Sequence, residues 1–279
     1  MKMENNIEYI RQFVSFSGKC PYQCNHCYTY CSGYDSYDSG INVYEIVEGL
    51  KNQSFDIVYI SGHKENFIDP NEGLKLCEEI FKNFHTDIMV TTRNIFTQEQ
   101  LDRFEKLNYA MKAENKDLYF CASIPALQSY KRLEPNPIIP NPYQRMENLK
   151  RVYDRGIQTF LTLRPLCPDS YIPIKEVLEI IEICEKSTSI VLSNGIVVDD
   201  EILNKLKGFP QNFACQQKPL MPCLKNNLSM KYVDVEKELD IIKQKCKSLK
   251  LPFFEHSLPA IKYLKKKKDS IVQPSVFTI

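Results

Sequence analysis

Short apolar segments alternate with amphipathic segments along most of this chain. Six apolar segments have the length of a strand, and the five segments between them space their apolar residues along one helical face. Strand then helix, repeated, is typical of a parallel sheet covered by helices. We therefore predict an α/β fold, a partial (β/α)6 TIM-like barrel, with its ligand site at the carboxyl ends of the strands. The predicted strands are residues 13–16, 57–60, 88–90, 118–121, 159–163 and 189–192, and the predicted helices are residues 43–50, 72–84, 98–107, 145–153 and 174–184.

The alternation weakens after Gly208. Beyond this point the pattern predicts a helix over residues 234–249, a short strand over residues 251–254, and a helix over residues 259–264 that four lysines close. A length of 279 residues fits one barrel with an appendage. We therefore expect a barrel core over residues 1–207 and a C-terminal extension over residues 208–279 that packs on it.

Charge and composition argue against several classes of function. Lys and Arg number 36 against 35 for Asp and Glu, and a formal net charge of +1 disfavours a general polyanion binder. A nucleic-acid partner stays possible, but the net charge does not support it. No apolar run approaches the roughly 18 residues of a membrane span, so we expect no membrane partner. The chain has only 9 glycines and neither a Walker-type phosphate loop nor a GxGxxG motif, which removes the usual nucleotide phosphate cradles.

Three cysteines crowd the loop directly after the first predicted strand, in the sequence CPYQCNHC over residues 20–27. The first residues of the chain lack a secretory signal, so we expect a cytoplasmic protein whose 11 cysteines are reduced and serve metal binding or catalysis. Thiolates spaced CxxxCxxC at a barrel mouth can bind three irons of a [4Fe-4S] cluster and leave the fourth iron open. The alternative is a structural zinc site completed by Cys31.

The position and spacing of this motif resemble the radical S-adenosylmethionine (SAM) superfamily. In that superfamily the open iron chelates the amino and carboxylate groups of SAM, and one electron breaks a carbon–sulfur bond. The resulting 5'-deoxyadenosyl radical abstracts hydrogen from the substrate. The resemblance implies a [4Fe-4S] cluster on Cys20, Cys24 and Cys27, SAM as a second cofactor, and an electron donor of the flavodoxin or ferredoxin type.

The segment Ser61-Gly62-His63-Lys64-Glu65 follows the second strand, where the superfamily has its GGE-type motif. His63 stands in place of the usual second Gly. The resemblance implies that Glu65 and nearby backbone carbonyls accept hydrogen bonds from the methionine ammonium. His26 could stack on adenine or shield the cluster. Further residues at strand ends correspond to places that contact ribose, carboxylate and adenine in similar enzymes, and the SAM-binding residues predicted in addition to Glu65 and His26 are Ser61, Gly62, Asn94, Ser123, Arg164 and Ile196.

Arg164 has a physical argument of its own, because a guanidinium can hold a carboxylate through two hydrogen bonds and stays charged when partly buried. A salt bridge at the barrel rim is the alternative for this residue. Cys121, within the fourth strand, and Cys167, just past the fifth, are candidates for donating hydrogen to a product radical. Cys215, Cys223 and Cys246 form only a poor motif for a second cluster.

From the fourth strand onward the pattern resembles the spore photoproduct lyase-like branch of the superfamily. The resemblance is carried by Ser123-Ile124-Pro125, by Leu133-Glu134-Pro135 with Arg145, and by residues 163–168. It leaves the substrate open among a nucleic-acid lesion, a modified peptide and a small metabolite. Glu134 and Arg145 are predicted to form a buried ion pair that ties the Pro-rich loop after the fourth strand to the next helix. A protein of another class, a non-catalytic metal-binding scaffold that keeps the barrel, is the alternative, because the GGE-type segment is altered.

Overall fold

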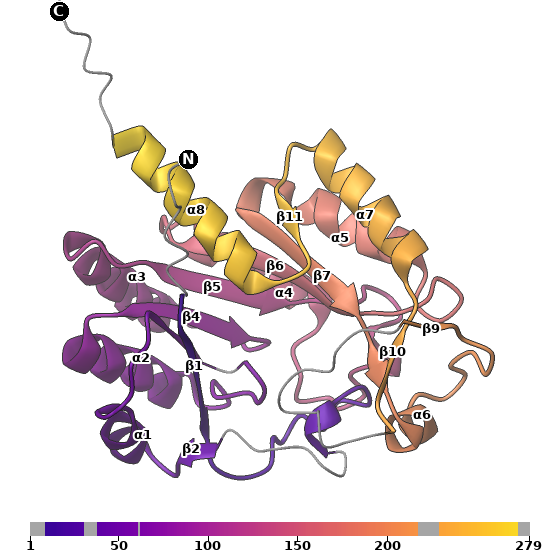
Figure 1. The fold of residues 1–279 in the computed structure, drawn as a ribbon, viewed down its shortest axis with the longest axis horizontal. Helices are drawn as coiled ribbons and strands as arrows, with labels where there is room; N and C mark the ends of the chain where they lie inside the picture. The colour runs from indigo at the N-terminus through magenta and orange to yellow at the C-terminus, as the bar shows by residue number, and fades with distance from the viewer. Residues whose placement is uncertain (1–8, 31–37, 61, 217–228, 273–279) are drawn as a thin grey trace, which may run out of the picture.

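A computed structural model describes residues 9–30, 38–60, 62–216 and 229–272. All six predicted strands are present, and they lie side by side in chain order, each parallel to its neighbours. Two short strands extend this sheet, one beside the first strand and one beside the last, and the sheet does not close. The predicted partial α/β barrel is therefore confirmed (Figure 1). In sheet order the strands are β11 (Phe253–Phe254), β7 (Ile190–Gly195), β6 (Gln158–Leu166), β5 (Leu118–Ser123), β4 (Asp87–Thr92), β3 (Ile57–Ile60), β1 (Arg11–Phe16) and β2 (Asp38–Gly40).

The five predicted helices follow their strands as expected, and their starts are encoded locally. The side chains of Thr97 and Asn141 each accept a hydrogen bond from the backbone three residues later, completing a capping box, and Pro70 and Pro142 occupy first-turn positions that need no N–H donor. No helix in the described part of the chain combines the length and apolar character needed to cross a membrane. These helices are α1 (Val43–Leu50), α2 (Pro70–Phe84), α3 (Gln98–Ala113), α4 (Pro142–Tyr153) and α5 (Ile174–Cys184).

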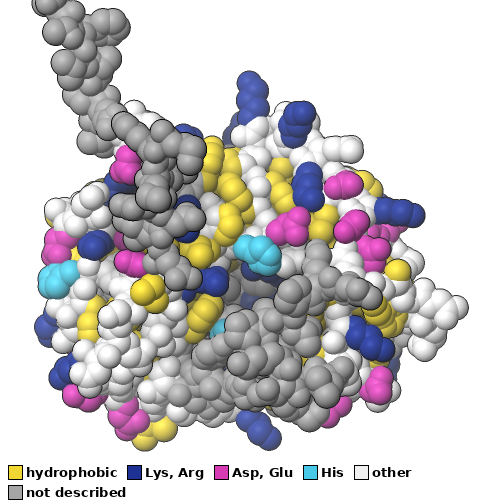
Figure 2. Space-filling view, viewed as in Figure 1, with side chains coloured by type: hydrophobic (Ala, Val, Ile, Leu, Met, Phe, Trp, Pro, Cys, Tyr) yellow, Lys and Arg dark blue, Asp and Glu magenta, His cyan; other side chains and the backbone are white. Residues whose placement is uncertain are grey.

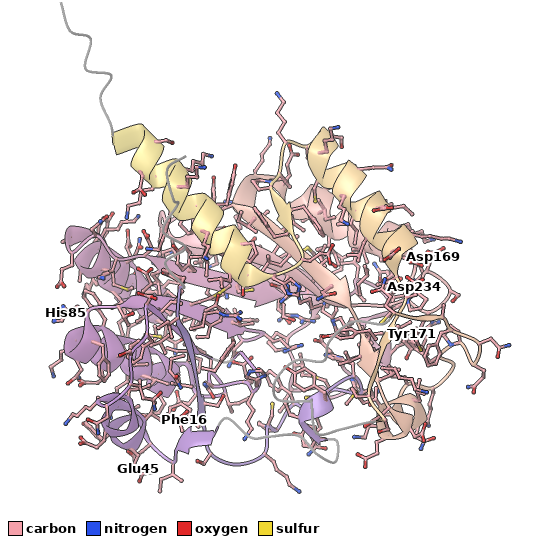
Figure 3. The ribbon with its side chains drawn as sticks, in the orientation of Figure 1. Phe16, Glu45, His85, Asp169, Tyr171 and Asp234 are labelled. Atoms are coloured by element: carbon pink, nitrogen blue, oxygen red, sulfur yellow. The ribbon has the colours of Figure 1, made fainter. Side chains whose placement is uncertain are left out.

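The C-terminal residues form the predicted strand β11 and two long helices, together with short elements that sequence analysis did not anticipate. Asp169 and Asp234 lie ahead of α5 and α7 and accept hydrogen bonds from the first backbone N–H groups of these helices, at 2.7 and 3.0 Å (Figure 3). The domain boundary at residue 208 stays a prediction. The remaining elements are η1 (Tyr28–Tyr30), η2 (Tyr130–Arg132), η3 (Glu185–Ser187), β8 (Val197–Val198), α6 (Asp200–Lys205), β9 (Cys215–Gln216), β10 (Lys231–Val233), α7 (Glu236–Ser248) and α8 (Ser257–Val272).

The two faces of the sheet pack against different helices, because successive side chains of a strand point to opposite faces. Outward residues such as Val58 and Phe120 belong to the large core that the sheet shares with α1 to α5. Inward residues such as Tyr59 and Phe160 form a second core with Ile261 of α8. Helix α8 therefore covers the inner face of the open barrel, where it lies across the strands (Figure 1).

Candidate functional site

A cavity of about 560 Å³ lies at the carboxyl ends of the strands, where the barrel fold predicts a ligand site. It is lined by inward residues of β1 and β3 to β7, by the cysteine loop, and by the segment that enters α8. The face of the molecule seen in Figure 2 is hollowed near its centre, and Lys or Arg and His side chains lie beside the hollow.

The three predicted cluster ligands, Cys20, Cys24 and Cys27, all line this cavity, and all three are free thiols. Burial raises the pKa of Cys24 to about 12, although the Arg93 guanidinium counteracts the effect. Burial also raises the pKa of Cys27, whose thiol lies 2.9 Å from the Thr29 hydroxyl. Thiolates of Cys24 and Cys27 therefore need positive charge close by, which a metal group would supply.

The cysteine loop is fastened to the segment that follows β5. The backbone N–H of Asn25 donates to the carbonyl of Leu133 at 2.8 Å, and its side-chain amide donates to the carbonyl of Arg132 at 2.9 Å. In return, the side-chain amide of Asn136 donates to the carbonyl of Pro21 at 2.9 Å. The Pro-rich loop thus lies against the cysteine loop and supports it.

Next to this contact in the chain, Glu134 forms a buried ion triad with Arg93 and Arg145. The carboxylate of Glu134, fully buried, lies 2.6 Å from Nη2 of Arg145 and 2.5 Å from Nε of Arg93. Burial alone would raise the pKa of Glu134, but the two guanidinium groups lower it to about 2. Arg145 also donates to the carbonyl of Ser123 at 2.6 Å. The predicted Glu134–Arg145 pair is confirmed, and Arg93 is a partner that sequence analysis missed.

Glu65 lines the cavity, but its carboxylate already holds three donors of the chain itself. One oxygen accepts from the backbone N–H of Phe67 at 2.9 Å and from the Thr92 hydroxyl at 2.8 Å, and the other accepts from the backbone N–H of Arg93 at 2.9 Å. Burial raises the pKa of Glu65, while these hydrogen bonds counteract the rise. Glu65 therefore joins the loop after β3 to the end of β4, and its predicted contact with SAM stays a prediction.

Gly62 and His63 complete the altered motif, whereas Ser61 lies outside the described residues. A Cβ atom on Gly62 would lie 2.8 Å from the Phe13 ring, so this position has no room for a side chain. His63 packs on Phe13 with ring centroids 4.9 Å apart, and its Nδ1 lies 2.8 Å from the Tyr28 hydroxyl. Burial lowers the pKa of His63 to about 4, so the imidazole is neutral at pH 7.

Arg164, on β6, and Cys121, on β5, face the same cavity. Arg164 donates to the carbonyl of Glu255, and its Nε is buried without a hydrogen-bond partner. Within the described residues Arg164 makes no ion pair, so the rim salt bridge considered for it is not seen there. The Cys121 sulfur lies 2.5 Å from the Thr162 hydroxyl, and burial raises its pKa, which keeps the thiol protonated. Ser123 lines the cavity as well, one inward position further along β5.

Three other predicted site residues are placed differently from expectation. Asn94 lies beyond the lining of the cavity, where its amide donates to the carbonyl of Phe67. Cys167 lies in the core between the sheet and the outer helices, so a hydrogen-donor role, which needs a thiol on the cavity, does not fit it. Ile196 lines the cavity, but its backbone N–H donates to Leu166 and its carbonyl accepts from Val233, each at 3.0 Å.

The alternation of side-chain directions along β4 and the residues that follow it explains why Arg93 lines the cavity and Asn94 does not. Met89, Thr91 and Arg93 occupy alternate positions, and all three line the cavity. Asn94 falls on the opposite parity and bonds to the neighbouring loop. All four residues from Thr91 to Asn94 were candidates at this strand end, and strand alternation was the sequence signal that favours Thr91 and Arg93 over Asn94.

The cavity has an excess of positive charge that the whole-chain balance conceals. Arg11, Lys64, Arg93 and Arg164 line it, against Glu65 as the acidic lining residue. Arg93 is already paired with Glu134, so three other cations face one carboxylate and three thiols, which favours a bound group that is anionic. His26 also lines the cavity, and its buried Nδ1 makes no hydrogen bond.

The arrangement of potential metal ligands is the following. In residues 9–30, 38–60, 62–216 and 229–272, no three His, Cys, Asp or Glu side chains converge closely enough to hold a metal ion. Cys31, on which the zinc alternative depends, and Cys223 lie outside these ranges. Cys246 is buried in the outer core and Cys215 is exposed on β9.

The chain resembles known proteins in sequence over part of its length. It is 23% identical over 168 residues to an uncharacterized protein from Methanocaldococcus jannaschii, a match that covers 57% of this chain and 60% of that protein. No family model matches the chain.

Two solved structures share its architecture. One is SuiB from Streptococcus suis, bound to S-adenosylmethionine, with a TM-score of 0.56 over 89% of this chain and 50% of that one. The other is a radical SAM methyltransferase from Sphaerobacter thermophilus, with a TM-score of 0.50 over 89% of this chain and 65% of that one. The chain thus spans between half and about two thirds of the length of these three proteins. At 11% identity, these likenesses show a shared fold.

Proposed function

We propose that this protein is a radical SAM enzyme, with a [4Fe-4S] cluster on Cys20, Cys24 and Cys27 and SAM in the adjoining cavity. The observation that carries the proposal is that three free thiols of one loop line the mouth of a barrel whose fold is shared by a radical SAM methyltransferase. When bound, the cluster and SAM supply a 5'-deoxyadenosyl radical that abstracts a hydrogen atom from the substrate.

The residues of the chain have distinct tasks in this proposal. The Pro-rich loop holds the cysteine loop through Asn25 and Asn136, and the Arg164 guanidinium offers its free Nε to the methionine carboxylate. The neutral thiol of Cys121 lies on the inner face, where it can donate hydrogen to a product radical. The α8 helix and the apolar side chains beneath the cavity exclude water from the reaction.

The substrate and the reductant follow from the family resemblance alone. A flavodoxin or ferredoxin would deliver the electron, and a nucleic-acid lesion, a peptide or a small metabolite would occupy the cavity beside SAM. Membership of the spore photoproduct lyase-like branch stays a prediction.

Anaerobic reconstitution with iron and sulfide tests the proposal. The wild-type protein should gain iron–sulfur absorbance that dithionite bleaches, and it should release 5'-deoxyadenosine when SAM is added. Cys24→Ala should abolish both signals, whereas Cys77→Ala, which removes a buried thiol of α2 away from the cavity, should retain them. A wild-type protein that binds zinc and releases no nucleoside contradicts the proposal.

A non-catalytic metal-binding scaffold is the second candidate, and a specific observation favours it. Both oxygens of Glu65 and the backbone of Ile196 are already engaged within the chain, so two contacts expected for SAM are occupied. Equilibrium binding of SAM to the reconstituted protein separates the candidates. The enzyme should bind SAM, and Arg164→Met should weaken binding about tenfold or more, as expected for loss of a charge-assisted hydrogen bond. The scaffold should show no binding in either form.

A further inference from the structure

The ion triad Arg93–Glu134–Arg145 has two guanidinium groups and one carboxylate, and therefore carries a net positive charge inside the protein. Only one of its members, Arg93, lines the cavity, where Cys24 is also found. The Glu134–Arg145 pair was predicted from the sequence, whereas the contact of Glu134 with Arg93 was not. Its position behind the cysteine loop raises the question of what a buried cation does there.

Arg93 is held at both of its ends. Its backbone N–H donates to Glu65 at 2.9 Å, and its Nε donates to Glu134 at 2.5 Å. The other oxygen of Glu134 is bound to Arg145, whose side chain is only 1% exposed, at 2.6 Å. The carboxylate cannot turn away from Arg93 without breaking its second pair, so the Arg93 guanidinium has one preferred position.

The same short segment also positions the cysteine loop. The carbonyl of Leu133, next to Glu134 in the chain, accepts the hydrogen bond of the Asn25 backbone N–H, next to Cys24. Arg93 is therefore attached to the segment Leu133–Glu134 through Glu134, and Cys24 is attached to the same segment through its neighbour Asn25. A change in the distance between them would require this segment to move as a whole.

We propose that Glu134 is a positioning residue that fixes the charge of Arg93 beside Cys24, and that this charge sets the reduction potential of the cluster. The inference rests on the proposed function, since it needs the cluster to be present. Reduction adds one negative charge to the group held by the cysteines. A fixed cation in a low-dielectric interior stabilises that added charge, and a carboxylate beside the cation weakens the effect. Arg suits this task because its guanidinium stays protonated when buried.

The two residues therefore have opposite effects on the potential. Loss of the Arg93 charge should make the cluster harder to reduce. Loss of the Glu134 charge leaves Arg93 less compensated and should make the cluster easier to reduce. A residue that only supports the fold would not give shifts of opposite sign.

The test is a redox titration of the reconstituted protein without SAM, followed by electron paramagnetic resonance. Arg93→Gln should lower the equilibrium constant for reduction about tenfold or more, which corresponds to a shift of about 59 mV toward more negative potential. Glu134→Gln should shift it in the opposite direction, and Arg93→Lys should restore most of the wild-type value. Arg151→Met is the matched control on α4, because Arg151 is partly buried and donates to the Phe96 carbonyl away from the cavity; its potential should equal that of the wild type.

Several results of this titration would overturn the proposal. Unchanged potentials, or shifts of the same sign in Arg93→Gln and Glu134→Gln, overturn the proposal. Loss of the cluster from both variants while Arg93→Lys retains it also overturns it, since the triad would then only build the loop. If Glu134→Gln does not fold, the comparison of Arg93→Gln with Arg93→Lys decides alone. Failure of the wild-type protein to take up a cluster instead refutes the proposed function, and the inference with it.

Discussion

At the amino-terminal end of the barrel interior, Asp87 and Asp117 are paired with lysines of α8, whereas at the carboxyl-terminal end polar side chains face a cavity. Lys265 lies 2.6 Å from Asp87 and Lys268 lies 2.9 Å from Asp117. The hydroxyl of Tyr9 also donates to Asp87. This end, which we call the base, is closed by apolar side chains and by opposite charges that lie in contact.

The carboxyl-terminal end, the mouth, leaves buried nitrogen atoms without partners. Nε of Arg164 and Nδ1 of His26 are two such atoms, and both residues line the cavity. Buried polar atoms are almost always hydrogen-bonded in native proteins, so unsatisfied ones that face a cavity indicate where a ligand completes the structure. The same strands thus contribute paired charges at one end and unmet hydrogen-bonding capacity at the other.

The Arg93–Glu134–Arg145 triad is an exception at the mouth, because its charges are paired and its Glu134 and Arg145 side chains are at most 1% exposed. The lysines of the base are 29% and 38% exposed. Both ends contain ion pairs, but burial should make those of the mouth far more costly to break.

The largest expected effect comes from Arg145→Met, which leaves the Glu134 carboxylate with one buried partner in place of two. Breaking a buried pair costs about 3–5 kcal/mol, so the free energy of unfolding should fall by that amount in a denaturant titration. Lys150→Met is the control on the same helix, because its pair with Asp154 is more than half exposed and screened by solvent, so it should change stability far less. Equal effects from the two substitutions would remove the distinction between buried and exposed pairs.

A second effect concerns His63 at the mouth. Burial lowers its pKa from 6.5 to about 4, so between these values the unfolded chain binds more protons than the folded one. The titration of His63 therefore costs no stability above about pH 6.5. As the pH drops toward 4, the free energy of unfolding should fall by about 1–3 kcal/mol.

Chemical denaturation of the metal-free protein at several pH values measures this slope. His63→Gln should flatten the slope between pH 6.5 and 4. His85→Gln, which alters an exposed side chain, should leave the slope intact. A slope that persists unchanged in His63→Gln would mean that other groups of the mouth or the base control acid sensitivity.

Much of the fold was predictable because its signals are local. Strands β3 to β7 are mostly buried, and helices α1 to α5 each bury apolar residues along one face, so the alternation of strand and helix is visible in the sequence. The strands β2, β8, β9 and β10 span only two or three residues, which is too short for any periodicity. The four lysines were expected to close the last helix, yet α8 continues to Val272, and two of them reach aspartates far away in sequence.

The part of the site that lies in one loop could be predicted from the sequence, whereas the part formed by residues of separate strands could not. The cysteine motif is contiguous, so its common position on the cavity followed from its place after β1. Arg93 and Glu134 are 41 residues apart and meet only because β4 and β5 are neighbours. The sequence predicted Cys121 and Cys167 equally as hydrogen donors. In the structure the Cys121 thiol belongs to the inner core, whereas the Cys167 thiol belongs to the outer core.

The smallest expected effect tests the base. Lys268→Met removes a pair whose lysine is 38% exposed, so the loss of stability should be about 0.2–1 kcal/mol. Lys267, exposed on the same helix, is the matched control, and Lys267→Met should have no measurable effect. Because about 1 M salt shortens the screening length to roughly 3 Å, the difference between the two variants should shrink when the denaturant titration is repeated in high salt. A loss as large as that of Arg145→Met, unaffected by salt, would show that the pairs of the base are held as deeply as the triad of the mouth, and the contrast between the two ends would no longer hold.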